Sequence, residues 1–279
     1  MNQRNRAEGW KHAKLSGHAN EELVEAIVEN DGEIQSRLLD CVRKFDAIVE
    51  EIDFGGLKEQ NVPCILGGTT KSKTDMHLYL DDGTSINVSI KKSAGGQVFL
   101  IGVDRFIEGF EAQFNKIIPT KVKRAISLYW GTASDTLDIV NEYAVNEISY
   151  QIRKHRLTKE TLDRYDASLS DALLNWFNEN LLEIFDFCFS TGLAKNKNDW
   201  ANLIWYRNEL DENDMDDIFN ISDIKNNLPL FSASWGNRTG GSTIQLPFGF
   251  VQWHSPTKTI PGCMQFHHSY DKIKELMEK

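Results

Sequence analysis

The chain has 279 residues, of which 41% are hydrophobic, and its formal net charge is −10. This length and composition can bury a full core, and the absence of a Pro- or Ser-rich linker favours a single domain over residues 1–279. No apolar run approaches the roughly eighteen residues that a membrane span needs. The stretch from Met1 to Leu15 is basic and polar and has no signal-peptide pattern, so we expect no signal peptide there.

The cysteines indicate a reducing compartment. They lie far apart in the sequence and form no Cys-x-x-Cys pair, which argues against a zinc site. We therefore expect a soluble protein of the cytoplasm. The four residues are Cys41, Cys64, Cys188 and Cys263.

The amino-terminal third of the chain predicts two helices followed by a β-hairpin. The helices are expected over residues 20–30 and 33–52, the first with Asn20 as its N-cap. Two strands follow, over residues 75–80 and 84–92, joined by the turn Asp81-Asp82-Gly83.

The turn fixes the register of this hairpin. With glycine in the left-handed position of a three-residue loop, one face becomes continuously apolar. A two-residue loop would mix apolar and polar residues on both faces, which is unfavourable wherever one face is buried. The expected facing pairs are Met76 with Val88 and Leu78 with Ile86 on the apolar face, and Asp75 with Ser89, His77 with Asn87 and Tyr79 with Ser85 on the polar face.

The polar face places an acid near a lysine. Asp75 faces Ser89, and Lys91 lies one pleat beyond them. Mg²⁺ prefers hard oxygen ligands and keeps several waters, so Asp75, the backbone carbonyl of Ile90 and phosphate oxygens would be enough to hold it. A bound metal activates water, and a neighbouring ammonium group can orient that water. The alternative interpretation is a solvated hairpin face with ordinary polar residues, since so short a motif is weak evidence by itself.

The rest of the chain predicts an α+β fold with a central mixed β-sheet flanked by helices. A buried strand is expected over residues 97–101, followed by a core helix with phenylalanines at helical spacing. A helical block, short strands and a glycine-punctuated, strand-rich carboxyl-terminal segment complete it. The ranges are about 134–190 for the helical block, 201–207 for the short strands and 231–266 for the carboxyl-terminal segment, and the phenylalanines are Phe106, Phe110 and Phe114.

Three sequence blocks resemble a known family. The hairpin is similar to the PD-(D/E)XK nuclease motif, and the chain as a whole resembles the small MspI-like group of type II restriction endonucleases, which cut short palindromes. The blocks occur in the family's order and span most of the chain. They are Leu15-Ser16-Gly17-His18-Ala19-Asn20-Glu21, then Lys73-Thr74-Asp75 with Ser89-Ile90-Lys91-Lys92-Ser93, and finally Gly241-Ser242-Thr243-Ile244-Gln245 with Met264-Gln265-Phe266.

The chain departs from the family pattern at two positions of the hairpin. Thr74 stands where the motif has proline, which is harmless. Ser89 stands where the motif has Asp or Glu, and this removes a charged metal ligand, although the group accepts neutral polar residues there. In related nucleases an acid on the first helix often faces the site, so Glu21 is a candidate substitute. Its alternative role is that of an acid in the first turn, favoured there by the helix dipole.

The resemblance implies sequence-specific cleavage of double-stranded DNA by a Mg²⁺-dependent type II site-specific deoxyribonuclease. The catalytic residues would be Asp75, Ser89, Lys91 and Glu21, and the metal ligands Asp75, Ser89 and Ile90. The alternatives are a repair or nicking endonuclease on the same scaffold and a catalytically silent DNA-binding protein, for which Ser89 is the motivating feature. The expected partners are double-stranded DNA and the cognate DNA methyltransferase of a restriction-modification system, with no membrane and a monomeric or weakly dimeric state.

On this interpretation the single domain has three parts. They are a catalytic core over residues 1–130, a mostly helical block over 131–227 and a DNA-recognition segment over 228–270. The net charge of −10 is unfavourable for contact with phosphates, but acidic residues concentrate between Glu209 and Asp223, in an expected solvated loop.

Basic residues are expected to contact phosphates, and Gln, Asn and Arg side chains to read purine edges in the major groove. Each of these residues has an ordinary surface role as its alternative. The candidate DNA-binding residues are Lys92, Ser93, Gln97, Lys121, Lys123, Arg124, Trp235, Asn237, Arg238, Gln245, Gln252, His254 and Lys258.

Overall fold

A computed structural model describes residues 19–54, 61–144, 156–210, 215–237, 240–254 and 262–278. Contacts divide the chain into two compact units, each built from two segments. The division does not follow the predicted parts of the chain, and the single nuclease domain stays a prediction. The first unit is Met1–Ala94 with Phe189–Ile224, and the second is Gly95–Cys188 with Lys225–Lys279.

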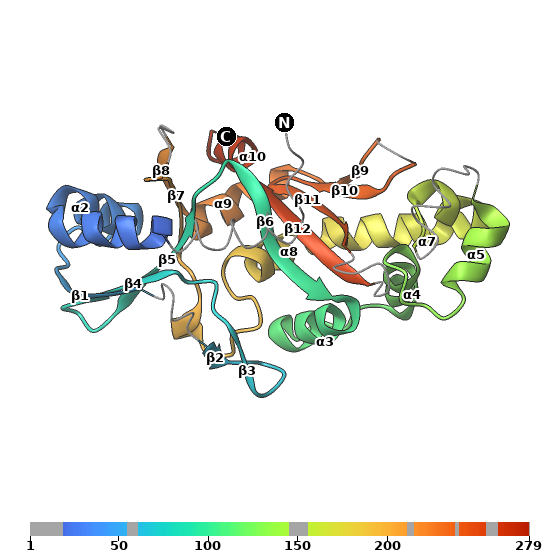
Figure 1. The fold of residues 1–279 in the computed structure, drawn as a ribbon, viewed down its shortest axis with the longest axis horizontal. Coiled ribbons are helices and arrows are strands. Elements are labelled where there is room, and N and C mark those ends of the chain that lie inside the picture. Colours follow the sequence, from blue (N-terminus) through green and yellow to red (C-terminus); the bar gives the residue numbers. More distant parts are fainter. Residues whose placement is uncertain are drawn as a thin grey trace. The chain divides into compact units, whose positions relative to one another are not determined.

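The first unit is built on a five-stranded mixed sheet (Figure 1). All neighbouring strands are antiparallel except β5 and β7, which are parallel. The order is β1 (Val49–Phe54), β4 (Met76–Leu80), β5 (Ser85–Lys91), β7 (Leu203–Arg207) and β8 (Asp216–Asn220). A separate two-stranded sheet joins β2 (Asn61–Pro63) to β3 (Thr69–Lys71). The helical segments include residues 19–30, α2 (Gly32–Cys41), η2 (Lys197–Asp199) and the first residues of α9 (Ile221–Asn227), which continues into the second unit.

The hairpin β4–β5 has the predicted register. Met76 faces Val88 and Leu78 faces Ile86. Gly83 adopts a φ of 75°, the left-handed conformation that the three-residue loop requires. The amide of Leu80 donates to the carbonyl of Thr84 at 2.9 Å and closes the turn.

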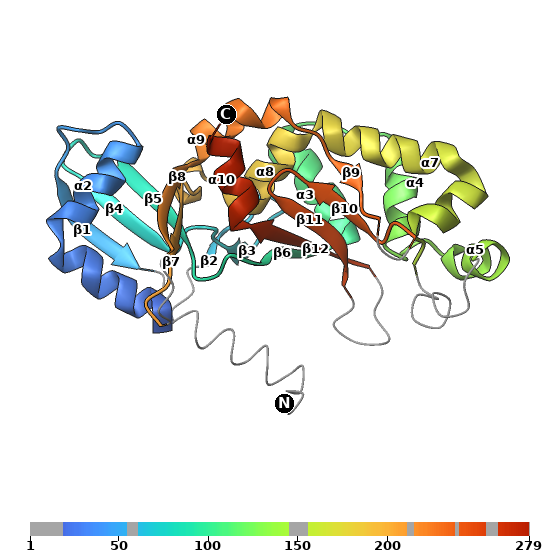
Figure 2. The same ribbon diagram turned by 90° about the horizontal axis from the view of Figure 1, so that it is seen from above.

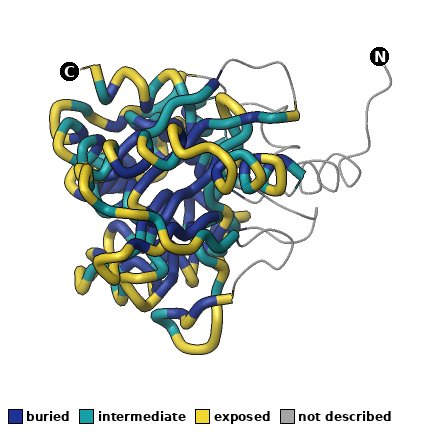
Figure 3. Tube along the Cα trace, turned by 90° about the vertical axis from the view of Figure 1, so that its left-hand side faces the viewer, coloured by how far each residue is buried: buried dark blue, intermediate teal, exposed yellow. Residues whose placement is uncertain are grey.

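The apolar face of this hairpin is covered by the two amino-terminal helices, which lie over the same side of the sheet in Figures 1 and 2. Val24 and Leu38 from the helices are fully buried, as are Met76 and Leu78 from β4. The buried parts of the trace are dark blue in Figure 3. Burying such side chains stabilises by roughly 1.5–3 kcal/mol each, which fixes the face of the hairpin that carries its polar side chains.

The second predicted helix is too long. α2 begins after Asp31, whose carboxylate caps the helix by accepting from the amides of Glu33 and Ile34, and it ends at Cys41. Arg43 then adopts a left-handed φ of 61°. The last residues of the predicted helix, 49–52, belong instead to strand β1 (Val49–Phe54). This strand pairs with β4, and the pairing buries Ile52 and Phe54 partly in the core.

The second unit contains an antiparallel sheet of five strands, β6-β12-β11-β10-β9. α7 and α8 lie on one side of this sheet in Figures 1 and 2. The strands are β6 (Gly95–Gly102), β9 (Ser234–Trp235), β10 (Thr243–Leu246), β11 (Gly249–His254) and β12 (Cys263–Ser269). The helical segments among its described residues include α3 (Val103–Phe114), α4 (Thr120–Tyr129), α5 (Thr136–Tyr143), α7 (Lys159–Glu179), α8 (Leu181–Phe189), η3 (Leu228–Leu230) and α10 (Tyr270–Met277).

The strand expected over residues 97–101 is present, but it is not buried. It belongs to β6, an edge strand of the second sheet, and of these residues Ile101 alone is buried while Leu100 is 37% exposed. Successive side chains of a strand point to opposite faces of the sheet, so Ile101, opposite Met264, lies on the buried face and Leu100, opposite Gln265, lies on the other face. The core helix is confirmed as α3, in which Phe106 and Phe110 are fully buried.

The α+β fold class is therefore confirmed, with the strand-rich carboxyl-terminal segment and the helical block as predicted. Among the helices described, none combines the length and apolar character needed to cross a bilayer.

At Gly249 the backbone of β11 lies very close to the backbone of β12. Its φ is 158°, and a methyl group there would lie 1.8 Å from the backbone oxygen of His267. We expect Gly249→Ala to lower the free energy of unfolding by about 3 kcal/mol because the backbone itself must shift. Chemical denaturation measures this. Gly32→Ala is the matched control, since Gly32 lies in a helix with open space around it, and this change should be neutral or stabilising.

Candidate functional site

The hairpin brings together three residues of the predicted site. Asp75, just before β4, accepts a hydrogen bond from the hydroxyl of Ser89 on β5 at 3.3 Å. The ammonium of Lys91 donates to the same hydroxyl at 2.6 Å. The side chains of Lys91 and Asp75 are 17% and 29% exposed, so solvent reaches the cluster while the surrounding sheet restricts it.

Asp75 is oriented by the backbone of the neighbouring strand. The amide of Ile90 donates to Asp75 Oδ2 at 2.7 Å, and the amide of Asp75 itself donates to the carbonyl of Val88 at 2.9 Å. Both side-chain contacts and the Lys91 ion pair fall on Oδ2. Among the described residues, Oδ1 accepts no hydrogen bond and is left for a ligand.

The Lys91 ammonium lies among the oxygen atoms predicted to bind metal. It is 2.6 Å from Ser89 Oγ, 3.2 Å from the carbonyl oxygen of Ile90 and 3.8 Å from Asp75 Oδ2. These three oxygen atoms belong to the three predicted metal ligands. The Lys91 ammonium lies between them and balances the charge of the Asp75 carboxylate. A divalent cation that used the same oxygen atoms would therefore compete with this ammonium.

The residue in the motif's proline position supports the site. The amide of Thr74 donates to Ser72 Oγ at 3.0 Å, a bond that proline could not make. The hydroxyls of Thr74 and Ser72 both donate to the carbonyl of Asp199, at 3.2 and 3.0 Å. The segment that leads into Asp75 is thus fastened to a loop more than a hundred residues later, and sequence reasoning did not identify this role.

A buried pair on the same polar face was also missed as a supporting element. His77 Nδ1 lies 2.9 Å from Asn87 Oδ1, and both side chains are buried. The amide nitrogen of Asn87 donates to the carbonyls of Asn198 and Trp200 at 2.7 and 2.8 Å. This loop covers the face next to Asp75 and Ser89, so the site is confined to one end of the hairpin. The predicted cross-strand pairing of His77 with Asn87 was the feature of the sequence that could have indicated this supporting role.

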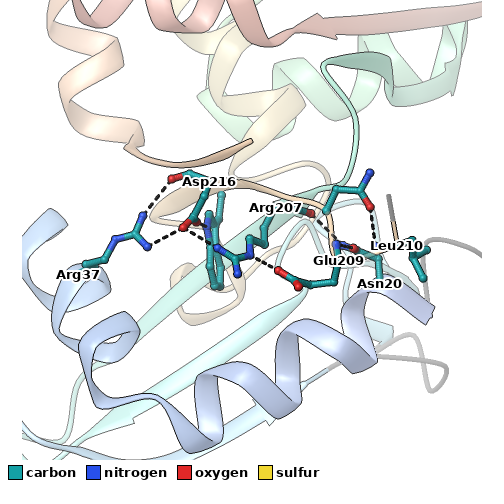
Figure 4. Close-up of polar contacts among 8 residues, drawn as sticks. Asn20, Arg37, Arg207, Glu209, Leu210 and Asp216 are labelled. Atoms are coloured by element: carbon teal, nitrogen blue, oxygen red, sulfur yellow. Dashed lines mark hydrogen bonds and ion pairs between the residues drawn. The ribbon is translucent and has the colours of Figure 1, made fainter. Parts of the chain in front are cut away.

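Asn20 does not cap the first helix. Its buried side chain donates to the carbonyl of Arg207 at 3.0 Å and accepts from the amide of Glu209 at 2.7 Å (Figure 4). Because Lys91 faces Tyr206 in the parallel pair β5–β7, this anchor holds residue 20 of the helical segment at the end of the sheet where Lys91 lies. Glu21 follows in the same turn, and its role at the site stays a prediction.

Part of the expected acidic loop is a strand. Asp216 begins β8, and its carboxylate pairs with Arg37 at 2.7 Å and with Arg207 at 2.5 Å, one on either side in Figure 4. The indole nitrogen of Trp205 donates to its second oxygen at 2.8 Å. Charge pairing and strand pairing therefore order a segment that composition alone marked as solvated. Residues 211–214 lie outside the described part of the chain.

This network shifts the titration of Asp216. Burial raises the pKa of the Asp216 carboxyl, but hydrogen bonds from Arg37 and Trp205, with the arginine charges, outweigh that effect and hold the pKa below its usual value. The carboxylate is thus ionised at neutral pH and fixes Arg207 beside the anchor of the first helix.

The donor set of the site suits a hard cation. It consists of oxygen atoms from a carboxylate, a hydroxyl and a backbone carbonyl, the kinds that Mg²⁺ prefers. Within the described residues, no three His, Cys, Asp or Glu side chains form a group that could hold a metal ion. Substrate oxygens and waters would have to complete any shell at Asp75.

Two of the three basic side chains on α4 that are predicted to contact phosphates form ion pairs with acidic side chains. Lys123 pairs with Glu111 at 2.8 Å, and Arg124 binds both oxygens of Asp135 at 2.7 and 2.5 Å. Lys121, the third member of the cluster, lies on the same helix. Lys92 and Ser93 directly follow β5 in the first unit. All five stay predicted DNA contacts.

Most of the predicted base-reading residues lie on the second sheet. Gln97 is on β6, Gln245 on β10 and Gln252 on β11, and the pairing of these strands with one another and with β12 places the three on one face. Trp235 on β9 instead packs against Tyr129, at 5.4 Å between ring centroids. Asn237 follows β9, and His254 ends β11; Arg238 and Lys258 lie outside the described residues.

No family model and no curated protein matches the chain. One solved structure similar to it is the crystal structure of the restriction endonuclease MspI in complex with its cognate DNA. The two chains are 15% identical, with a TM-score of 0.48, over 84% of this chain and 77% of the other.

The Asp216 network predicts a pH-dependent loss of stability. We expect Asp216→Asn to lower the free energy of unfolding by roughly 2 kcal/mol at pH 7. A carboxyl with a depressed folded-state pKa stabilises above its unfolded-state pKa and loses that effect as pH falls through the folded-state value. The difference from wild type should therefore persist above about pH 5 and shrink below about pH 4. Denaturant unfolding at a series of pH values measures it.

Asp223→Asn is the matched control, because Asp223 pairs with Arg43, whose side chain is 65% exposed. Such surface pairs contribute about 0–1 kcal/mol. An equal loss for both variants at pH 7 would contradict a stabilising role for the Asp216 network.

Proposed function

We propose that this protein is a Mg²⁺-dependent endonuclease that cuts both strands of DNA at a specific sequence, as type II restriction endonucleases do. The observation that carries the proposal is the cluster of Asp75, Ser89 and Lys91 on one face of the hairpin, with Asp75 oriented by the amide of Ile90. The resemblance of the hairpin to the PD-(D/E)XK motif supports it. A DNA methyltransferase of matching specificity would then protect the host, and a cytoplasmic location would follow.

Asp75 and Lys91 divide the chemistry between them. Asp75 presents Oδ1 as an anionic ligand, because its other oxygen is held by the backbone. Bound Mg²⁺ would supply activation of water and stabilisation of charge on the phosphorus. The Lys91 ammonium orients the attacking water or balances the negative charge that develops on the phosphate oxygens. Ser89 holds that ammonium through its hydroxyl and adds a neutral oxygen donor.

The position of Lys91 is consistent with this division. Its ammonium lies 2.6 Å from Ser89 Oγ, 3.2 Å from the carbonyl oxygen of Ile90 and 3.8 Å from Asp75 Oδ2. The lysine can therefore act as the counter-ion of Asp75 and as the positioned cation of the reaction. Because Ser89 is neutral where the motif has an acid, Lys91 has less negative charge to balance at this site.

Plasmid cleavage with and without Mg²⁺ tests the proposed function. Defined linear fragments that appear only with Mg²⁺ are the expected result, and sequencing their ends would give the recognition site and the cleavage position. Nicked circles would indicate a repair or nicking endonuclease. Intact plasmid together with DNA binding would show a silent DNA-binding protein and overturn the proposal.

Asp75→Asn and Lys91→Ala should each reduce the cleavage rate by at least about a hundredfold while leaving DNA binding within a few-fold of wild type. Both groups act on the transition state more than on the bound substrate. Cleavage rates and binding constants measured on the same duplex separate the two effects. Asp82→Asn is the matched control, because this carboxylate lies in the turn at the other end of the hairpin and pairs with Lys44.

Lys91→Met should strengthen the binding of divalent cations although it removes cleavage. The variant deletes the competing ammonium but keeps the oxygen atoms of Asp75, Ser89 and Ile90. We expect several-fold tighter binding of Mn²⁺ by calorimetry, and a further change, Asp75→Asn on the Lys91→Met background, should remove it. Binding weaker than that of wild type would show that the lysine does not compete with the metal.

A further inference from the structure

One face of the second sheet carries a row of uncharged polar side chains. Strand pairing sets Gln265 directly opposite Gln252, while Gln97 faces His267. The other face of β12 is buried, with Met264, Phe266 and His268 inside. The amide row therefore lies on the open side of the sheet, and it includes Gln265, which the sequence did not single out as a contact residue.

The hydrogen bonds along the row run in one direction. The amide nitrogen of Gln252 donates to Gln265 Oε1 at 2.9 Å, and the amide nitrogen of Gln265 donates to Gln97 Oε1 at 2.8 Å. Each glutamine thus fixes which end of the next amide is oxygen and which is nitrogen. The row ends at Gln97, on the edge strand β6.

The inner end of the row is held in place. The ring of His267 stacks on Phe250, with centroids 4.4 Å apart and planes at 7°, and His267 Nε2 lies 3.3 Å from the Gln252 amide nitrogen. On the neighbouring strand β10, Gln245 Oε1 accepts a hydrogen bond at 3.4 Å from Lys272 of α10, which also donates to the carbonyl of Gly249 at 2.9 Å. Amides held in this way lose little conformational entropy when a ligand binds.

Gln97 offers a hydrogen-bonding edge at the exposed end. Its side chain lies in an exposed position, and Gln265 uses one of the two lone pairs of Gln97 Oε1. Within the described part of the chain, no hydrogen bond uses its amide nitrogen. One acceptor and one donor side by side are what the adenine edge requires, since its N6 amino group donates and its N7 accepts.

We propose that Gln97 reads an adenine in the major groove and that Gln265 and Gln252 are positioning residues that set the direction of its amide. The inference rests on double-stranded DNA as the substrate of the proposed function. The row has no charged member, so it suits the neutral edge of a base and not a phosphate. Antiparallel strands are among the elements that fit the major groove.

Selection from a library of random duplexes tests the proposal through binding alone, with Ca²⁺ in place of Mg²⁺, followed by sequencing of the bound fraction. Wild type should enrich a sequence that contains an A·T pair. Gln97→Leu should lose the preference at one A·T position by roughly tenfold and keep the other positions. Gln265→Glu keeps the size of the side chain but cannot donate to Gln97, and it should weaken the same preference.

A modified base gives the second measurement. Placing 7-deazaadenine at that position removes the N7 acceptor, and it should weaken binding by wild type roughly tenfold but leave Gln97→Leu unaffected. Lys91→Ala is the matched control, because it should lose cleavage and keep the full sequence preference. Melting temperatures of all variants show that the sheet remains folded.

The outcomes separate the inference from the proposed function. An unchanged preference in Gln97→Leu, a selected site without an A·T pair, or equal losses on all sequences would overturn the reading role of Gln97, even if wild type cleaves plasmid. A selective loss in Gln97→Leu without any cleavage by wild type would support the reading role and overturn the nuclease. A wild-type protein that binds no duplex would overturn both.

Discussion

The packing of β4 and β5 beneath the amino-terminal helices is the constraint on which the site depends. Met76 and Leu78 are fully buried against Val24 and Leu38, so the hairpin cannot slip by one residue without exposing its whole apolar face. The polar face is a consequence of this burial. The polar cluster of Asp75, Ser89 and Lys91 is thus positioned by apolar side chains on the opposite face of the hairpin.

The hairpin and its site could be predicted from the sequence because the information is local. The turn with Gly83 and the alternation on both strands set the register, and the register brings Asp75 to Ser89. The burial of Phe106 and Phe110 was predicted for the same reason, because residues four positions apart lie on the same face of a helix. Patterns contained within a dozen residues need no knowledge of the rest of the chain.

What the sequence did not reveal depends on distant partners. Residues 49–52 continue an acceptable helical pattern, and only pairing with β4 makes them a strand. Asp216 looks like part of a solvated acidic run until Arg37 and Arg207 are placed on either side of it. Asn20 resembles an N-cap, but its partners belong to residues 207 and 209. In each case a tertiary contact outweighs the local preference.

The parallel pairing of β5 with β7 has a consequence for how the protein is made. The hairpin is complete early in synthesis, yet Asn87 meets Asn202 only 115 positions later. Until residues 203–207 emerge, β5 is an open edge with unpaired backbone groups, the kind of edge that attracts other strands. The nascent chain therefore carries this hairpin with one edge unpaired while residues 95–188 of the second unit are being synthesised, and a chain that stops before β7 never pairs that edge.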